Sequence, residues 1–261
     1  MKVEKDDRLI LITNDDGLHA GGLIALTEVM QEFGKVVVIS SIESRSGMSQ
    51  ALTVKMPIRI KLLTETETKR IYACSGTPTD GVKIAINQLL ERKPDWVVSG
   101  INHGANASVS VIYSGTMAAA IEGCLYGIDS VGFSLDNYSA EADFGPASKY
   151  VRDIMNSLSR KRLPKGICLN VNIPTCPIQE IKGIRVCRQA KGNWREEFEK
   201  RKDPMGKTYY WLTGMFENHE PESTDTDEWA LSNDYVSVVP VSIDMTAHGF
   251  INDMKKQLNK E

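Results

Sequence analysis

The fold is decided by residues 8 to 17, which read Arg8-Leu-Ile-Leu-Ile-Thr13-Asn14-Asp15-Asp16-Gly17. The apolar, β-branched part, 8–13, predicts a short strand buried on both faces, as in a parallel sheet. A glycine-containing loop follows, and residues 23–30 then carry apolar side chains at helical spacing. Residues 35–40, Lys-Val-Val-Val-Ile-Ser, predict a second buried strand. The order strand, loop, helix, strand is the beginning of a right-handed, doubly wound α/β fold.

The same alternation of strands and helices continues to about residue 175. Further strands are predicted at 71–74, 95–99, 129–134 and 166–171, and helices at 77–91, 116–126 and 142–158. Residues 51–63 alternate apolar and basic side chains, which is typical of a half-exposed strand or hairpin arm. Residues 8–175 are therefore predicted to form one α/β core with a mostly parallel sheet.

The character of the chain changes after Pro174. Residues 178–240 are richer in aromatic and charged side chains and contain few long apolar runs. This composition predicts a smaller β-rich lobe or projecting arms, with 235–239 as a strand returning to the body and 246–259 as a closing helix. We therefore divide the chain into a core (8–175), a β-rich extension (176–240) and a C-terminal segment (241–261) whose helix returns to the core.

Composition and charge narrow the range of partners. The chain of 261 residues has a formal net charge of −3, which is not the basic footprint expected of a protein that binds long nucleic acid or an anionic membrane. Its five cysteines are odd in number and show no C-x-x-C spacing, which argues against a disulfide framework and a structural zinc site. Because the sequence has neither an apolar signal segment nor a membrane-length apolar run, we expect a cytoplasmic protein.

The adjacent carboxylates Asp15 and Asp16 are the first candidate site. They follow a buried strand directly, and ligands bind to open parallel sheets at the carboxyl ends of the strands. Two neighbouring negative charges need compensation, and carboxylate oxygens suit hard divalent cations such as Mg²⁺, Mn²⁺ or Ca²⁺. The alternative is a hydrated turn, since Asn, Asp and Gly all favour turns.

A second candidate loop, Glu43-Ser44-Arg45-Ser46-Gly47, follows the second strand and so lies at the same edge of the sheet. The Ser46 hydroxyl could ligate a metal, and the Arg45 guanidinium could face a phosphate. A solvated loop is the alternative interpretation.

The third candidate is the most specific. Ser99-Gly-Ile-Asn102-His103-Gly-Ala-Asn106 follows another strand, and Ser114-Gly115-Thr116 then opens a helix of small residues. Free backbone N–H groups at a helix start, flanked by hydroxyl groups, can hold a phosphate without net positive charge. The alternative is an ordinary serine or threonine cap behind a long loop.

Several other motifs are absent or carry less information. The chain has no G-x-x-x-x-G-K-[ST] loop, G-x-G-x-x-G fingerprint or G-x-S-x-G elbow, which weakens the case for an ATPase, a dinucleotide enzyme or a serine hydrolase. Thr224-Asp-Thr-Asp227 resembles a D-x-D phosphatase nucleophile, but no buried strand precedes it, so we interpret it as the cap of a short helix.

Five ordered motifs together resemble the SurE family, the stationary-phase survival proteins that act as metal-dependent 5′/3′-nucleotidases. They are Thr13–Gly17, Ser44–Gly47, Ser75–Pro78, Ser99–Gly104 and Tyr113–Thr116. The resemblance implies a Rossmann-like, three-layer α/β/α core. It also implies a C-terminal extension that builds homodimers or homotetramers by exchanging arms.

The resemblance also implies a site, residue by residue. One divalent cation per subunit (Mg, Mn or Ca) would be held by Asp15, Asp16, Ser46 and Asn102, with the two aspartates as catalytic residues. The substrate, a nucleoside monophosphate, would contact Asn14, Asn106, Ser114, Gly115 and Thr116. His103 departs from the pattern, because an arginine often follows the asparagine in this family.

Two other hypotheses stay open at this point. The same loops could form a non-catalytic module that binds a nucleotide or phosphate, and the aromatic-rich extension could serve as an oligomerising scaffold.

Overall fold

The computed structural model describes residues 8–195 and 197–258, and it is built on a nine-stranded sheet. The strand order is β3-β4-β2-β1-β5-β6-β7-β13-β8, and the six neighbouring strands from β4 to β7 all run parallel. The strands of this sheet are β1 (Leu9–Thr13), β2 (Lys35–Ser41), β3 (Ile60–Glu65), β4 (Lys69–Cys74), β5 (Trp96–His103), β6 (Asp129–Leu135), β7 (Ile167–Ile173), β8 (Ile184–Val186) and β13 (Val236–Ser242). The predicted α/β fold with a mostly parallel sheet is confirmed.

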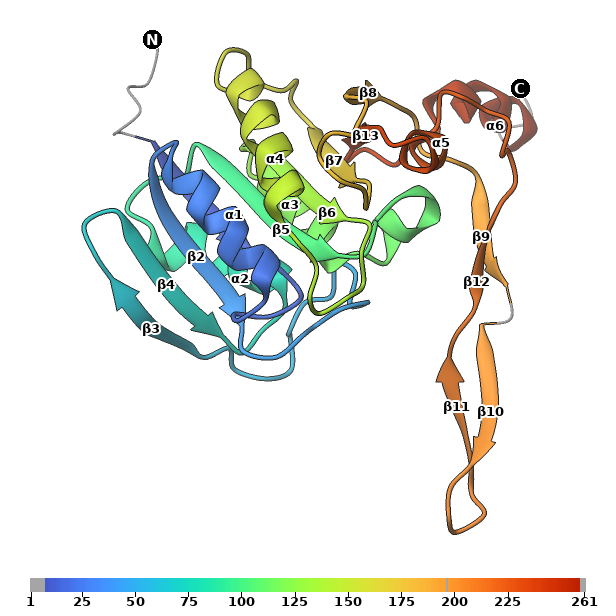
Figure 1. Ribbon diagram of the computed structural model, residues 1–261, viewed down its shortest axis with the longest axis horizontal. Helices are drawn as coiled ribbons and strands as arrows, with labels where there is room; N and C mark the ends of the chain where they lie inside the picture. The colour runs from blue at the N-terminus through green and yellow to red at the C-terminus, as the bar shows by residue number, and fades with distance from the viewer. Residues whose placement is uncertain (1–7, 196, 259–261) are drawn as a thin grey trace.

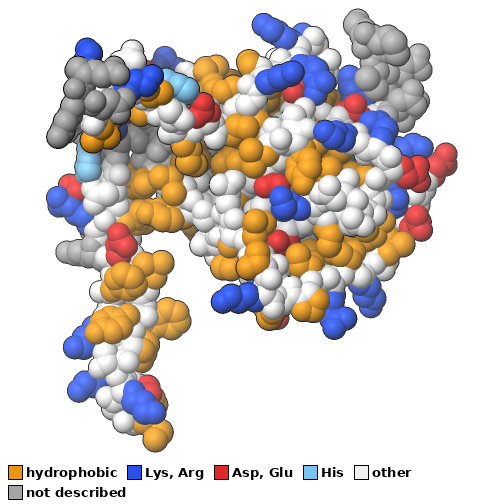
Figure 2. All heavy atoms as spheres, turned by 180° about the vertical axis from the view of Figure 1, so that it is seen from behind, with side chains coloured by type: hydrophobic (Ala, Val, Ile, Leu, Met, Phe, Trp, Pro, Cys, Tyr) orange, Lys and Arg blue, Asp and Glu red, His pale blue; other side chains and the backbone are white. Residues whose placement is uncertain are grey.

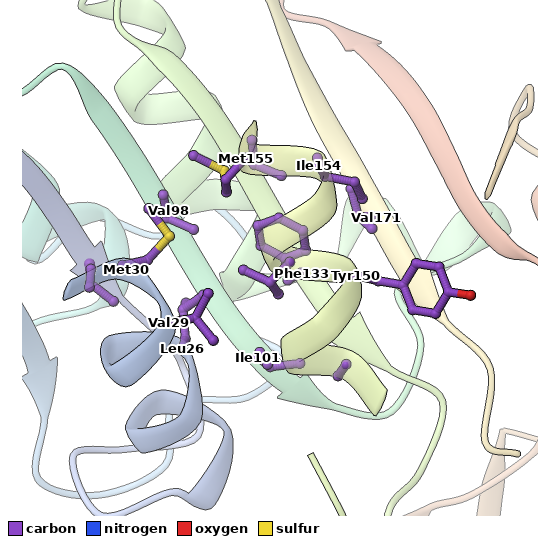
Figure 3. Close-up of a cluster of buried hydrophobic side chains, with 14 of the residues drawn as sticks. Leu26, Val29, Met30, Val98, Ile101, Phe133, Tyr150, Ile154, Met155 and Val171 are labelled. Atoms are coloured by element: carbon purple, nitrogen blue, oxygen red, sulfur yellow. The ribbon is translucent and has the colours of Figure 1, made fainter. Parts of the chain in front are cut away.

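Helices cover both faces of the sheet, so the core has three layers (Figure 1). The helices are α1 (Gly21–Gln31), α2 (Pro78–Ile84), α3 (Gly115–Leu125), α4 (Gly145–Leu158), α5 (Asp227–Ser232) and α6 (Ile251–Leu258). Helices α1 and α4 pack on one face, where Figure 3 shows their side chains meeting those of the strands beneath them. Helices α2 and α3 pack on the other face.

Strand β1 explains why residues 8–13 had to be almost wholly apolar. Ile10 and Ile12 belong to the core beneath α1 and α4, whereas Leu11 belongs to the core beneath α2 and α3. Successive side chains of a strand point to opposite faces, and both faces of this strand are covered.

Four local features differ from the sequence-based prediction. Residues 51–59 contain no strand, so the predicted segment contributes only the first residues of β3, which pairs antiparallel with β4. Strand β5 continues to His103 through a register irregularity after Ser99, so the loop predicted from residue 100 begins four residues later. The second helix passes into a π-helical turn, Ala85–Leu89, and a short 3-10 helix, η3 (Ser108–Ile112), lies within the predicted glycine-rich loop.

The C-terminal region forms a projecting arm. It is a long β-ribbon made of β9 (Gly192–Arg195), β10 (Phe198–Lys202), β11 (Thr208–Leu212) and β12 (Met215–Asn218). Strands β10 and β11 pair with each other, as do β9 and β12, all antiparallel. Figure 1 shows this arm extending well away from the sheet.

Parts of the region that the sequence assigns to the extension lie in the main sheet. Strand β13 pairs antiparallel with β7, and β8 pairs parallel with β13. A second short 3-10 helix, η4 (His248–Phe250), then leads into α6, which buries none of its described residues. Residue 259, the last of the predicted closing helix, lies outside the described residues. Within those residues, no helix is both long and apolar enough to span a membrane.

Candidate active site

The candidate site lies where β1, β2 and β5 end. Thr13, the last residue of β1, pairs with Ser99 of β5, so the loops that follow these two strands leave the sheet side by side. The helix α3 begins at the same edge, with its first turn beside Asp15. The loops after β1 and β5 and the start of α3 therefore meet at one edge of the sheet, as the sequence predicts.

Asp15 is the central side chain of the site. Its side chain accepts a hydrogen bond of 2.6 Å from the Thr116 hydroxyl, and the residue is only 3% exposed. Burial, reinforced by the neighbouring Asp16, raises the pKa of Asp15 to about 6, although the bond from Thr116 partly opposes this rise. The metal-free site therefore holds its ionised form at a cost in free energy.

Asp16 is fixed by the backbone of β5. Its Oδ2 accepts a 2.9 Å hydrogen bond from the His103 N–H, and burial raises its pKa above the ordinary value. The His103 ring itself packs edge-to-face against Phe144, with ring centroids 5.0 Å apart. His103 thus orients Asp16 through its backbone N–H, and it forms part of the cavity wall.

Asn102 presents an oxygen to this carboxylate pair. Its amide nitrogen donates to the carbonyl oxygens of His103 and Gly104, at 3.0 and 2.8 Å. Its Oδ1 lies 3.4 Å from the Thr116 hydroxyl, which also bonds Asp15. The side-chain amide is therefore oriented with its oxygen toward the site.

The Ser46 loop is attached to the same strand end. The Arg45 N–H donates to the Asp15 carbonyl oxygen at 2.7 Å, and the Ser44 and Ser46 hydroxyl groups lie 2.9 Å apart. Gly17 makes this approach possible, because it has a φ of +104° and an added Cβ would lie 3.2 Å from the Ile42 carbonyl oxygen.

These residues fit a hard divalent cation. Within the described part of the chain, no three His, Cys, Asp or Glu side chains cluster as metal ligands, so the candidate set pairs two carboxylates with neutral oxygens. The inward Oδ1 of Asn102 and the Ser46 hydroxyl are donors of that neutral kind. An all-oxygen set with two adjacent carboxylates is what Mg²⁺, Mn²⁺ and Ca²⁺ prefer, and a bound cation would offset the cost of ionising Asp15.

The start of α3 is packed against Asp15. Ser114 caps the helix by accepting a 3.0 Å hydrogen bond from the Met117 N–H. A Cβ at Gly115 would lie 2.8 Å from the Asp15 side chain, so only glycine allows the helix to begin this close to the carboxylate. The resulting helix start presents the positive end of its dipole beside the cavity, which favours an anion there.

Asn106 is held by a buried polar network. Its N–H donates to Asn172 Oδ1 at 2.7 Å, its side-chain amide donates to the Ser134 hydroxyl at 2.8 Å, and its carbonyl oxygen accepts from Asn170 at 2.8 Å. Asn170 and Asn172 lie on β7, and the sequence analysis did not select them, because buried asparagines in a strand give no local motif.

Asn14 occupies a different environment from the other predicted site residues. It is fully buried, its amide nitrogen donates to the Gly17 carbonyl oxygen at 2.9 Å, and its Oδ1 accepts from the Ser40 hydroxyl at 2.5 Å. Both ends of its side chain thus support the turn that carries Asp15 and Asp16. Like Asp16, Gly115 and Thr116, the residue is absent from the cavity wall described next.

A cavity of about 390 Å³ opens beside these groups. Asp15, Ser46, Asn102, Asn106 and Ser114 all line it, and His103, Tyr113 and Tyr138 complete the wall on the core side. The opposite wall comes from the arm, through Trp194, Glu197, Leu212 and Thr213. The aromatic character of the arm is visible in its sequence, but no local motif there predicts a site residue.

Fold and site together define a class: doubly wound α/β proteins in which adjacent carboxylates and neutral oxygen side chains lie beside a helix start at the carboxyl edge of a parallel sheet. Comparison with known proteins narrows the class. A family model described as "Survival protein SurE" matches residues 10–196, so the chain belongs to the SurE family.

Relatives and solved structures agree with this membership over nearly the whole chain. The chain is 52% identical to the 5′-nucleotidase SurE of Christiangramia forsetii, covering 97% of both chains. It is 38% identical to the 5′-nucleotidase SurE of Chlorobium luteolum, covering 97% of this chain and 98% of that protein. The crystal structure of the SurE protein from Aquifex aeolicus superposes with a TM-score of 0.82 at 36% identity, covering 95% of this chain and 99% of that one.

Proposed function

We propose that this protein is a metal-dependent phosphomonoesterase that hydrolyses nucleoside 5′-monophosphates, and 3′-monophosphates, to nucleoside and phosphate. The observation that carries the proposal is the hydrogen bond from Thr116, in the first turn of α3, to Asp15 at the wall of the cavity. This contact joins the carboxylate of Asp15 to the start of α3, which supports a metal ion held next to a substrate phosphate. The relatives' names, 5′-nucleotidase SurE, support the same substrate class.

Asp15, Asp16, Ser46 and Asn102 would hold one divalent cation per subunit, Mg²⁺, Mn²⁺ or Ca²⁺. When bound, such a cation supplies Lewis-acid stabilisation of charge on the phosphoryl oxygens. The protein's own part is to prepare the site: Thr116 orients Asp15, the His103 N–H orients Asp16, and Gly104 with His103 turns the Asn102 oxygen inward.

The substrate phosphate would lie at the start of α3, against Ser114, Gly115 and Thr116, with Asn106 beside it. The positive end of the helix dipole would favour an anion there and stabilise the departing phosphate. The nucleoside would then extend along the cavity toward the arm. Asn14 would act one step removed from the substrate, by holding the turn that carries the two aspartates.

Two routes for the reaction are compatible with this arrangement. In the route we favour, the oxygen of a water molecule bonds to phosphorus, the ester P–O bond breaks, and the departing nucleoside oxygen takes up a proton. In the other, Asp15 forms a phosphoenzyme that water then hydrolyses. Trapping a phosphorylated Asp15 during turnover would establish the second route.

The test of the proposed function is a metal-by-substrate screen on the purified protein. Release of phosphate from AMP and from an aryl phosphate is measured with Mn²⁺, with Mg²⁺ and with a chelator. We expect metal-dependent turnover that the chelator abolishes. Nucleotide binding without turnover would instead support the alternative, a non-catalytic nucleotide-binding module.

The three segments of the chain would then have different roles. Residues 8–175 would carry the metal and phosphate groups, 176–240 would serve chiefly for assembly into a homodimer or homotetramer, and 241–261 would close the chain with its helix. The exposed apolar side chains along the arm support this assignment, because Phe198 and Tyr210 are 65% and 60% exposed. Figure 2 shows hydrophobic side chains gathered along the projecting arm.

A further inference from the structure

Asp227, at the end of the Thr224–Asp227 motif, has a buried carboxylate that this proposed function does not use. The residue is 1% exposed, and its side chain accepts three backbone hydrogen bonds. Oδ2 accepts from the Ser108 N–H at 2.8 Å, and Oδ1 accepts from the Ala190 and Glu228 N–H groups at 2.8 and 2.9 Å. The predicted cap of α5 is made by its neighbour, because the Thr226 hydroxyl accepts from the Trp229 N–H.

The first two donors belong to different walls of the cavity. Ser108 lies in residues 104–114, which we call the site loop, and which carries Asn106 and Ser114. Ala190 lies in residues 188–191, the root of the arm, which leads directly into β9. Figure 1 shows α5 at this root, above the start of β9. One carboxylate of α5 therefore ties the site loop to the arm.

Two further bonds reinforce the junction. The Ser108 hydroxyl donates to the Ala190 carbonyl oxygen at 2.9 Å, and the Asp227 N–H donates to the Arg188 carbonyl oxygen at 3.0 Å. Ser108 has a φ of +50°, which is unfavourable for a residue with a side chain, so its backbone keeps this conformation only where its surroundings impose it. Ser108 is fully buried and Ala190 is 3% exposed, so water cannot replace these bonds.

We propose that Asp227 is a positioning residue that fixes the arm wall of the cavity against the site loop, and so sets the enzyme's affinity for the nucleoside part of its substrate. The inference rests on the proposed function. A nucleotide whose phosphate lies at the start of α3 must extend between Tyr113 of the site loop and Trp194 of the arm, since both line the cavity. Inorganic phosphate, held at the start of α3, would have no nucleoside part to contact the arm.

The substitution Asp227→Asn tests this arrangement with no change in size. Both carboxylate oxygens accept backbone N–H groups, so in either orientation the amide NH₂ faces a donor and one anchor is lost. Asp253→Asn is the matched control. It makes the same chemical change at an exposed side chain of α6, away from this junction.

For each full-length protein, kcat and KM for AMP are measured in saturating Mn²⁺, together with the inhibition constant of inorganic phosphate. For Asp227→Asn we expect KM for AMP to rise about tenfold, while the inhibition constant for phosphate and kcat change less than about threefold. Asp253→Asn should match the wild type. An equal rise in KM for AMP and in the inhibition constant of phosphate, or an unchanged KM for AMP, would overturn the inference.

The measurements on the wild type distinguish failure of the proposed function from failure of the role given to Asp227. If the wild type releases no phosphate from AMP, the proposed function fails and this inference fails with it; an active wild type with an unaltered Asp227→Asn overturns the inference alone. If Asp227→Asn does not fold, Ser108→Ala removes one hydrogen bond from the same junction. It should raise KM for AMP about two- to fivefold with the phosphate constant unchanged, and an unchanged KM would count against the junction.

Discussion

Asp15 combines near-complete burial with a neighbouring carboxylate, and both features disfavour its ionised form. A protein selected for stability alone would not keep this pair at the end of a buried strand. The surrounding bonds from Thr116 and from the His103 N–H orient the carboxylates without neutralising them. At the scale of the residue, the site is thus prepared for a cation at a cost to the metal-free protein.

Asp15→Asn should separate these two effects. Because the pKa of Asp15 is raised to about 6, the metal-free protein at pH 8 carries an unfavourable buried charge that asparagine lacks. We expect the metal-free variant to gain about 1–2 kcal/mol in free energy of unfolding. Its Mn²⁺-dependent AMP turnover should fall about 100-fold or more. Chemical denaturation and phosphate release measure the two effects, with the exposed Asp153→Asn as control, and wild-type turnover at low metal would show that the site is misplaced.

Glu228 gives a pH-dependent test. Burial, together with the charges of Asp227 and Asp136, raises its pKa from 4.5 to about 7. The native state therefore holds this proton more tightly than the unfolded state. The contribution of protonated Glu228 to the free energy of unfolding is complete below pH 4.5 and is lost as the pH rises through 7. Glu228→Gln should match the wild type near pH 4 and exceed it at pH 8 by about 1 kcal/mol, a figure reduced for the solvent access of this side chain.

Urea denaturation of the metal-free proteins at a series of pH values measures this difference. Glu222→Gln, an exposed glutamate in the turn before α5, is the control and should follow the wild type throughout. A constant gap between Glu228→Gln and the wild type from pH 4 to pH 8 would contradict the titration.

The residues of the candidate site differ in how far the sequence could reveal them. Asp15, Asn102 and Ser114 follow strands or open a helix, and their positions predict that they meet at one edge of the sheet. Trp194 and Asp227 reach the same region only through tertiary contacts across a long sequence separation. Nothing in their local sequence encodes that contact, so sequence patterns alone could not have placed them.

At the scale of the element, the prediction was most reliable where one local signal was sufficient. The start of the helix predicted from residue 77 is an example: the Thr77 hydroxyl accepts from the Asp80 N–H at 3.1 Å, and the Asp80 carboxylate accepts from the Thr77 N–H at 2.9 Å. The end of the same helix was less predictable, because its π-helical turn depends on packing. The irregular end of β5, where the strand continues to His103, likewise depends on tertiary pairing with β6.

Thr77→Ala should measure the contribution of this capping box. The substitution leaves the Asp80 N–H without its partner and removes the bond from the Thr77 hydroxyl to the Ala51 carbonyl oxygen. We expect a loss of about 1–2 kcal/mol in free energy of unfolding, with metal affinity unchanged. Denaturant titration gives the value, and the exposed Thr68→Ala serves as control; equal stability of the two variants would contradict the role of the cap.

At the scale of the whole molecule, the core and the arm have opposite relations to water. The strands of the core bury apolar side chains on both faces, whereas β10 and β11 leave every described residue exposed. Composition predicted a change of character after Pro174, and the arm fits it. The path of the arm could not be predicted, because a two-stranded ribbon has no buried face of its own to fix its direction.

The arm provides the last test, since a two-stranded ribbon with apolar side chains on its surface is marginal in water unless something covers it. A second copy of the chain is the partner we propose. Replacing residues 198–212 by a short Gly-Ser turn should reduce the mass in solution, measured by light scattering, to that of a smaller assembly or a monomer. Because Leu212 also lines the cavity, the same deletion should raise KM for AMP while Mn²⁺ affinity stays unchanged.

The substitution Trp211→Lys separates the two roles of the arm. It should lower the mass in solution without raising KM for AMP, because Trp211 is exposed and absent from the cavity wall. If both variants keep the wild-type mass at micromolar concentration, the exposed face of the arm does not hold the assembly together, and the arm's remaining role is to complete the wall of the active site.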